Sequence, residues 1–243
     1  MSGTFNARGE IDPSQGVVIV CLGKKRSGKS KMGLLFFDSY PYDRVVIDIN
    51  GTDGPHKDVI ELTGTVDDLP SKWPEELRQD DKRMTLRYHP DTGSETFLED
   101  VDAVLGMAYR TGRVIVIVHE AGIIAKANKT PPHLRRMLQS NRHRQITLIL
   151  CAPRAVTMDP LVVAQADVVY VFEMPNKKDR ERVAENIGWP NEDFHLAVAE
   201  LEAHGYLRAD TNENRPESEG APDLRLVSCP ALPPEVVAHL DRL

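Results

Sequence analysis

The chain has 243 residues, of which 41% are hydrophobic, 28% charged and 6% aromatic, and its formal net charge is −7. This composition excludes a chain that is disordered throughout, a collagen and a coiled-coil rod, and a chain of this length can bury a core without disulfides or metals. Apolar runs stay far below the ~20 residues that span a bilayer, and the first ten residues lack the apolar core of a signal peptide, so we expect a cytoplasmic protein with no transmembrane segment.

The predicted elements alternate between strands and helices along most of the chain. Residues 1–14 are polar and expected to be loose. Continuously apolar, β-branched runs predict buried strands at 17–22, 44–50, 84–89, 113–118, 145–151 and 168–172. Helical spacing, prolines in first turns and a terminal glycine predict helices at 31–40, 94–110, 131–141, 177–187 and 191–204. A polar stretch from 51 to about 82 joins the second strand to the third.

Buried strands that alternate with helices predict an α/β core, residues 15–204, in which helices cover both faces of a mostly parallel sheet. The pattern changes after residue 205. In the extension 205–243, segments 206–208 and 224–228 are predicted to pair as a hairpin around a mobile polar loop at 210–222, before a terminal helix at 235–243. Cys21 and Cys151 lie in apolar runs and are expected to be buried thiols.

The strongest motif follows the first predicted strand and satisfies GxxxxGK[ST], the phosphate-binding P-loop. Glycines let backbone N–H groups turn toward phosphate oxygens, and the helix that follows directs its positive end at the same charges. Lys29 is predicted to reach the β- and γ-phosphates and Ser30 to bind Mg²⁺. The predicted nucleotide-binding residues are Gly23, Lys24, Lys25, Arg26, Ser27, Gly28, Lys29, Ser30 and Lys31.

A second site feature is Glu120, which comes just after the most apolar strand, 113–118. In many P-loop NTPases this strand ends in Asp-Glu, where Asp holds Mg²⁺ and Glu orients or deprotonates the attacking water. Glu120 fits the second role, whereas His119 stands where the aspartate is expected and adds no negative charge. Asp48, at the end of the second strand, is the nearest substitute as a metal ligand, with a simple strand-end cap as the alternative.

This succession of motifs resembles the FtsK–HerA superfamily of DNA-translocating ATPases, and most closely the small genome-packaging ATPases of tailless, membrane-containing viruses. The features shared over about residues 15–190 are the P-loop, a second strand ending in Asp, one further strand, a strand ending in Glu, the RHR sequence at 142–144 and the loop 152–159. The resemblance implies a RecA-like P-loop core that hydrolyses ATP with Mg²⁺ and assembles into a ring, usually a hexamer, around DNA. It also implies a capsid vertex or portal protein as partner, and a location in the host cytoplasm or the virion.

The same resemblance assigns roles to two arginines. Arg142 corresponds to the arginine finger that acts on the neighbouring subunit, with Arg144 as second choice. Arg154 corresponds to the arginine of a sensor loop, although Pro153 replaces the polar glutamine of that loop and cannot hydrogen-bond a phosphate. Asp159 matches the acid that follows in the family.

Basic residues concentrate between 113 and 144, where seven positive charges face one acid, Glu120. Such clustering is typical of a nucleic-acid contact that does not read sequence. The predicted DNA-contacting residues are Lys126, Lys129, Arg135 and Arg136. A solvated helix face and an interface with an acidic neighbour are the alternatives.

Three other functions remain open at this point. Asn176–Asp179 reads NKKD, which matches the guanine-specifying NKxD of GTPases, although Asn176 also suits the N-cap of the helix that follows. A small-molecule kinase is a further possibility, but no acceptor signature is visible. His119 and Pro153 also leave room for an ATP-gated assembly protein that does not act as a motor.

Overall fold

The computed structural model describes residues 11–51, 59–66, 83–127, 129–211 and 227–229. The described strands form one sheet in the order β3-β4-β2-β5-β6-β1-β7-β8-β9. The strands are β1 (Val18–Leu22), β2 (Asp43–Ile47), β3 (Val59–Thr63), β4 (Thr85–His89), β5 (Val114–Val118), β6 (Thr147–Ala152), β7 (Val168–Val171), β8 (Tyr206–Asp210) and β9 (Val227–Cys229). β1 to β7 pair in parallel and β8 and β9 antiparallel, which confirms the predicted α/β class.

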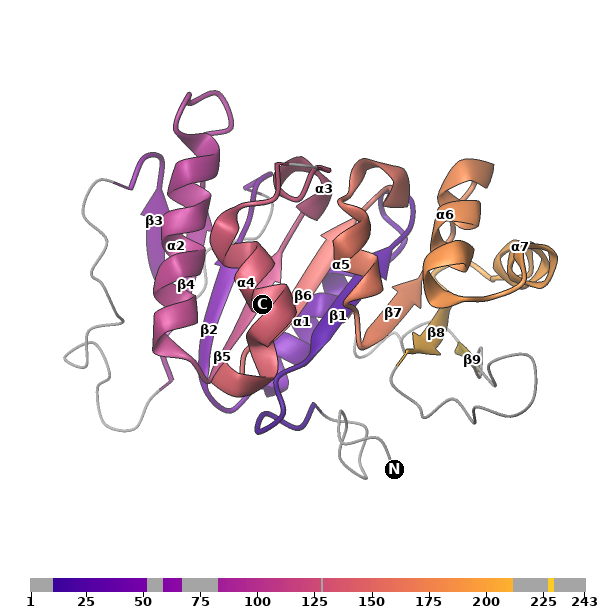
Figure 1. Cartoon of the computed structure of the whole chain (residues 1–243), viewed down its shortest axis with the longest axis horizontal. Coiled ribbons are helices and arrows are strands. Elements are labelled where there is room, and N and C mark those ends of the chain that lie inside the picture. Colours follow the sequence, from indigo (N-terminus) through magenta and orange to yellow (C-terminus); the bar gives the residue numbers. More distant parts are fainter. Residues whose placement is uncertain (1–10, 52–58, 67–82, 128, 212–226, 230–243) are drawn as a thin grey trace.

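Helices cover both faces of this sheet, as Figure 1 shows. The helices are α1 (Lys29–Ser39), α2 (Phe97–Thr111), α3 (Ala121–Ile124), α4 (Pro132–Arg144), α5 (Pro160–Ala164), α6 (Lys177–Ile187) and α7 (Asn191–Ala199). In that view α1 lies behind the sheet, and α2, α4 and α5 lie in front of it. Each side has its own apolar core, because continuously apolar strands such as β5 present side chains to both layers.

Two parts of the sequence-based description need correction or addition. The stretch 51–82 contains an edge strand, β3, which the sequence did not indicate because its residues VIELT are mostly exposed and only partly apolar. β8 and β9 pair antiparallel, as the predicted hairpin requires, but they also continue the core sheet beside β7. Most of the predicted loop 210–222 and the predicted helix 235–243 lie outside the described residues.

Helix α4 is interrupted near its end. Ser140 has φ −138° and ψ 21°, outside the helical region, and its hydroxyl donates to the Arg136 carbonyl at 2.7 Å. A side-chain bond of this kind competes with the helical backbone pattern and bends helices. Residues 141–144 therefore form a separate final turn.

No helix among the described residues is long and apolar enough to cross a membrane.

Candidate nucleotide-binding site

The site lies along one edge of the sheet, because parallel strands end at the same edge. β1 leads into the P-loop, β2 into Asp48, β5 into Glu120 and β6 into the loop 152–159. β1 and β5 flank β6, so the P-loop, Glu120 and this loop follow three neighbouring strands. Ligands of open α/β sheets bind at this carboxyl edge.

Glycines are required at both ends of the P-loop. Gly23 has φ 149° and Gly28 has φ 108°, conformations that other residues rarely adopt. A Cβ atom on Gly23 would lie 2.7 Å from the Phe172 Cβ, and one on Gly28 would lie 3.3 Å from the Phe172 Cε1. The loop backbone therefore packs directly against the end of β7, which fixes the curve from which its N–H groups act.

Lys29 and Ser27 lie inside this curve. Lys29 is only 7% exposed, and its Nζ donates to the Lys24 carbonyl across the loop at 2.8 Å. Burial lowers the pKa of Lys29, whereas the charges of Cys151 and Glu120 oppose this shift. The Ser27 hydroxyl is buried and finds no hydrogen-bond partner among the described residues. A buried ammonium, an unpaired hydroxyl and a glycine-shaped cradle fit the phosphates of a nucleotide.

The remaining P-loop side chains point outward or bind the loop to the sheet. The Lys24 ammonium forms an ion pair with the Glu173 carboxylate, and the Lys24 N–H donates to the Glu173 carbonyl at 2.8 Å. Lys25, Arg26 and Ser30 are exposed, and Lys31 is half-buried. Ser30 is exposed in the first turn of α1, a position that suits its predicted role as a metal ligand.

Glu120 is held in an unusual conformation at the end of β5. Its φ of 55° lies in the left-handed region, and it provides the N-cap position of α3. Burial lowers the pKa of Lys29, and the Glu120 charge is one of the nearby charges that oppose this shift. Non-glycine residues in this region carry strain of about 1–3 kcal/mol and occur often at functional sites. The structure thus brings the predicted water-activating carboxylate toward the P-loop lysine.

Asp48 is buried within its own turn. Its Oδ1 accepts hydrogen bonds from the N–H groups of Asn50 at 3.2 Å and Gly51 at 3.1 Å, and its Oδ2 lies 3.8 Å from His89 Nδ1. These contacts match the strand-end cap that the sequence left as the alternative to a metal ligand.

A group of buried side chains beneath the P-loop was not predicted as part of the site. Cys21 and Cys151 face each other in register on β1 and β6, and both are buried, as expected. The interaction between the two thiols lowers the pKa of Cys151 and raises the pKa of Cys21. Burial opposes the shift of Cys151, whereas His119 and Lys29 favour it. His119 thus belongs to a packed layer below the loop, where its N–H also donates to the Ile47 carbonyl at 3.0 Å.

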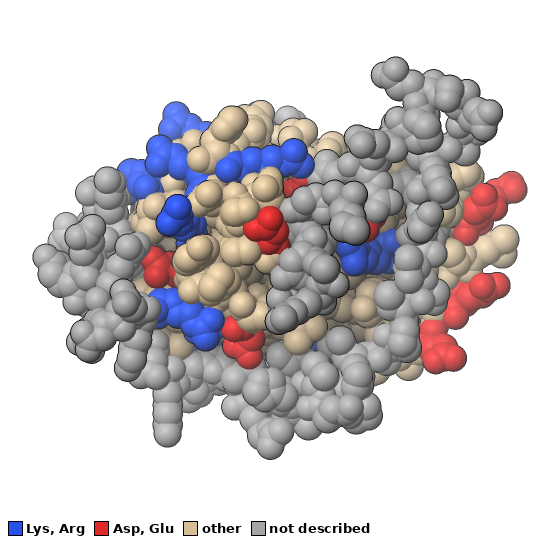
Figure 2. Space-filling view, turned by 90° about the horizontal axis from the view of Figure 1, so that it is seen from below, with Lys and Arg blue, Asp and Glu red and all other residues tan. Residues whose placement is uncertain are grey.

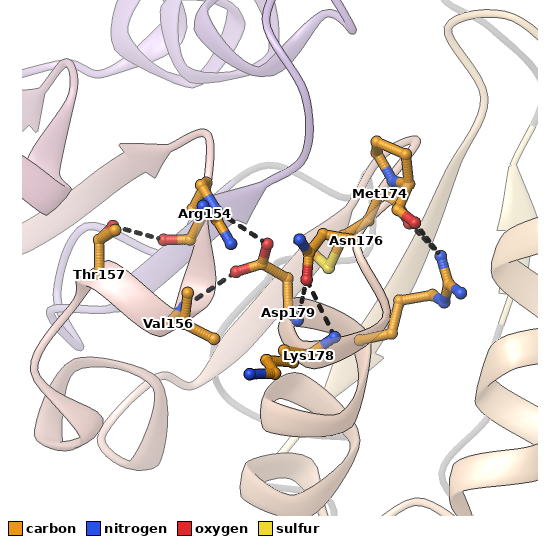
Figure 3. A network of polar contacts seen from close by, with 9 residues as sticks. Arg154, Val156, Thr157, Met174, Asn176, Lys178 and Asp179 are labelled. Atoms are coloured by element: carbon orange, nitrogen blue, oxygen red, sulfur yellow. Dashed lines mark hydrogen bonds and ion pairs between the residues drawn. The ribbon is translucent and has the colours of Figure 1, made fainter.

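The predicted sensor residue Arg154 is anchored by the start of α6 (Figure 3). Its Nε donates to Asp179 Oδ2 at 3.1 Å, and the Val156 N–H donates to Asp179 Oδ1 at 3.0 Å. Asn176 caps α6, since its Oδ1 accepts from the N–H groups of Lys178 at 3.0 Å and Asp179 at 3.4 Å. Asp179 is 1% exposed. The Asn176 side-chain oxygen and the Asp179 carboxylate are therefore engaged by the protein itself, as the capping interpretation requires.

Arg142 lies at the opposite, amino edge of the sheet. Its Nη2 donates to Asp167 Oδ1 at 2.7 Å, just before β7 begins, although its side chain remains 59% exposed. Arg144 covers the Tyr109 ring at 5.2 Å. A five-residue strand is about 17 Å long, so Arg142 cannot reach the nucleotide site of its own chain. A finger role for Arg142 requires a neighbouring subunit.

The basic stretch 113–144 divides into two surfaces. The exposed side chains of Lys126, Lys129 and Arg135 lie near the carboxyl edge, before and at the start of α4. Arg136 lies further along α4. Near the amino edge, the backbone N–H of Arg113 donates a hydrogen bond to the Arg144 carbonyl at 2.9 Å. Figure 2, seen from below, shows most of the visible Lys and Arg over the half of that face nearest α2 and α4, with some Asp and Glu among them, and further Asp and Glu at the end that carries α7.

Neither a protein-family model nor a curated protein matches the chain significantly. Among solved structures, the genome-packaging NTPase B204 from Sulfolobus turreted icosahedral virus 2, in complex with sulfate, has a TM-score of 0.61 and 21% identity over 82% of this chain and 92% of that one. Its complex with AMPPCP gives a TM-score of 0.60 at 21% identity, over 83% and 94% of the two chains. VirB4 of Thermoanaerobacter pseudethanolicus has a TM-score of 0.61 and 12% identity over 97% of both chains. The chain therefore has the fold of a viral genome-packaging P-loop NTPase, as its resemblance to the FtsK–HerA superfamily predicted.

Proposed function

We propose that this chain is the ATP-hydrolysing subunit of a ring-shaped motor that packages or translocates DNA for a virus or mobile element. The observation that carries the proposal is the glycine-shaped P-loop with Lys29 and Ser27 inside it and the Glu120 charge acting on Lys29. Its likeness in fold to a packaging NTPase that was solved with AMPPCP supports both the nucleotide and the motor role.

In this proposal each site residue has one task. The P-loop N–H groups, Ser27 and Lys29 hold the triphosphate, and the Ser30 hydroxyl holds Mg²⁺, which would neutralise charge on the phosphates. Glu120 orients or deprotonates the attacking water. Arg142 from the adjacent subunit stabilises negative charge as the phosphate is transferred. Arg154 senses the γ-phosphate from the neighbouring loop.

DNA contact is assigned to the exposed lysines at the carboxyl edge, Lys126 and Lys129, with Arg135 and Arg136 on the adjoining helix. Phosphate contacts by such side chains do not read sequence, which suits a motor that moves along any DNA. We propose a homo-oligomeric ring, with a hexamer as the expected size, and a capsid vertex or portal protein as its docking partner.

The deciding experiment measures phosphate release from ATP and from GTP, each with and without double-stranded DNA. ATP turnover that DNA stimulates is the expected result. A preference for GTP without a DNA effect would favour the GTPase. Tight ATP binding without any turnover, including in the presence of DNA, would favour the non-motor assembly protein.

A further inference from the structure

The loop that carries Lys126 and Lys129 is held at both ends by one residue, Asp159. At one end, the Asp159 N–H donates to the Ala125 carbonyl at 2.7 Å. At the other end, the Thr130 hydroxyl donates to Asp159 Oδ2 at 2.7 Å. The same hydroxyl lies 3.3 Å from the Lys126 carbonyl, so it also closes the loop on itself.

Asp159 is itself firmly held. It is 7% exposed, and its Oδ1 accepts a hydrogen bond from the Leu161 N–H at 3.0 Å, which caps α5. The Arg135 guanidinium lies 3.5 Å from Oδ2. A buried carboxylate with several donors forms stronger hydrogen bonds than a neutral acceptor does. Asp159 therefore connects both ends of the lysine loop to the start of α5.

Asp159 ends a loop that begins at the nucleotide site. The Ala152 carbonyl, where this loop starts, accepts the Gly23 N–H of the P-loop at 3.3 Å. The loop then passes Arg154 and the 3₁₀ turn η2 (Ala155–Thr157). A Cβ atom on Gly122, two residues after Glu120, would lie 2.7 Å from the Thr157 hydroxyl, so η2 packs closely on α3. One continuous set of contacts thus leads from the P-loop and Glu120 to Asp159.

We propose that Asp159 is a positioning residue that transmits nucleotide-dependent shifts of the loop 152–159 to the lysine loop 125–130, through its bond with Thr130. The inference rests on the proposed function, in which this lysine loop contacts DNA. Occupancy of the nucleotide site then changes DNA affinity, and by linkage DNA changes nucleotide affinity by the same factor.

The test compares the DNA affinity of the full chain with and without a non-hydrolysable ATP analogue, by fluorescence anisotropy of a labelled double-stranded DNA of mixed sequence. In the unaltered protein the analogue is expected to change DNA affinity about 5-fold or more. Thr130→Val removes the hydroxyl at similar shape and is expected to abolish this change. Thr130→Ser keeps the hydroxyl and is expected to retain it. Asp159→Asn keeps the cap acceptor for α5 and removes the charge, and it is expected to weaken the coupling too.

The outcomes separate this inference from the proposed function. Equal coupling in Thr130→Val and the unaltered protein would overturn the transmission role, while leaving DNA binding intact. If the analogue does not change the DNA affinity of the unaltered protein, the transmission role is also overturned. Absence of DNA binding by the unaltered protein would instead defeat the proposed motor, and the inference with it. Thermal unfolding of Thr130→Val and Thr130→Ser provides the check on folding, because a merely structural role would lower the unfolding temperature and leave the coupling unchanged.

Discussion

Asp167 binds Arg142 and the first strand of the core with the same carboxylate. One oxygen accepts from Arg142 Nη2 at 2.7 Å, and the other accepts from the Val18 N–H at 2.7 Å. β1 starts at Val18 and leads into the P-loop. Arg142 is therefore separated from the P-loop of its own chain by the length of this one strand. The ion pair holds the guanidinium at the amino edge of the sheet.

This geometry predicts complementation between two inactive variants. Arg142→Ala should bind ATP normally and lose turnover by about 10³-fold or more, the effect of removing an arginine finger. Lys29→Ala subunits keep Arg142 but lack a working P-loop. Mixing the two proteins should restore part of the ATPase activity, because mixed rings contain intact sites beside intact fingers. His143→Ala, at the next position, which is also exposed, is the matched control and should remain active. A mixture without activity would remove Arg142 from this role.

The buried position of Lys29 predicts a strong and specific effect on nucleotide binding. Lys29→Ala should abolish turnover and weaken ATP binding, measured by calorimetry, since the cradle then lacks its central positive charge. Lys25→Ala alters an exposed lysine of the same loop and should change ATP affinity far less. Equal losses in both variants would mean that overall charge, and not the position of Lys29, determines binding.

Replacement of Glu120 should separate binding from chemistry. Glu120→Gln keeps the size and polarity of the side chain but cannot accept a proton, so turnover should fall about 10²–10⁴-fold with little change in ATP affinity. Single-turnover phosphate release and equilibrium binding measure the two effects. A variant with normal turnover would assign water activation to another group.

The exposed lysines should contribute to the salt dependence of DNA binding. With Lys126 and Lys129 both changed to Ala, the slope of log affinity against log salt should become shallower by roughly 2, if each lysine contacts one phosphate. Basal ATP turnover should persist and DNA stimulation should fall. Changing Lys177 and Lys178, two exposed lysines on α6, removes the same charge elsewhere and should leave the slope unchanged.

The buried Asp179 predicts a structural role for the NKKD segment. Asp179→Ala would leave the Val156 N–H and Arg154 without their acceptor and should lower the free energy of unfolding by about 1–3 kcal/mol. Asn176→Ala should remove about 1 kcal/mol through the lost helix cap. Urea unfolding measures both. Neither variant should change the preference between ATP and GTP. If either variant lost GTP binding while ATP binding stayed unchanged, the result would support the GTPase interpretation of the NKKD segment.

The sequence was sufficient for those parts of the fold that depend on local pattern. Apolar runs located the central strands, and the P-loop motif located the phosphate cradle. Both features depend on residues that are adjacent in the sequence, so a local pattern is enough to predict them. The strand β3 could not be predicted from the sequence, because an exposed edge strand needs few apolar residues. Sequence also could not show that the basic stretch from Arg113 to Arg144 divides between two edges of the sheet. The partners Asp167 and Asp179 each lie 25 residues from the arginine that they bind, so only the folded chain brings them together.

The break in α4 at Ser140 determines how the two basic surfaces relate to each other mechanically. Arg135 belongs to the straight part of the helix, which adjoins the lysine loop, whereas Arg142 belongs to the separate last turn held by Asp167. A stiff, uninterrupted rod would transfer every displacement from one end to the other. In the ring that we propose, this break would allow Arg142 to stay beside the nucleotide of the neighbouring subunit while Arg135 and the lysine loop move. The subunits of such a ring could then act one after another, because the displacement of one end of α4 would not have to reach the other end.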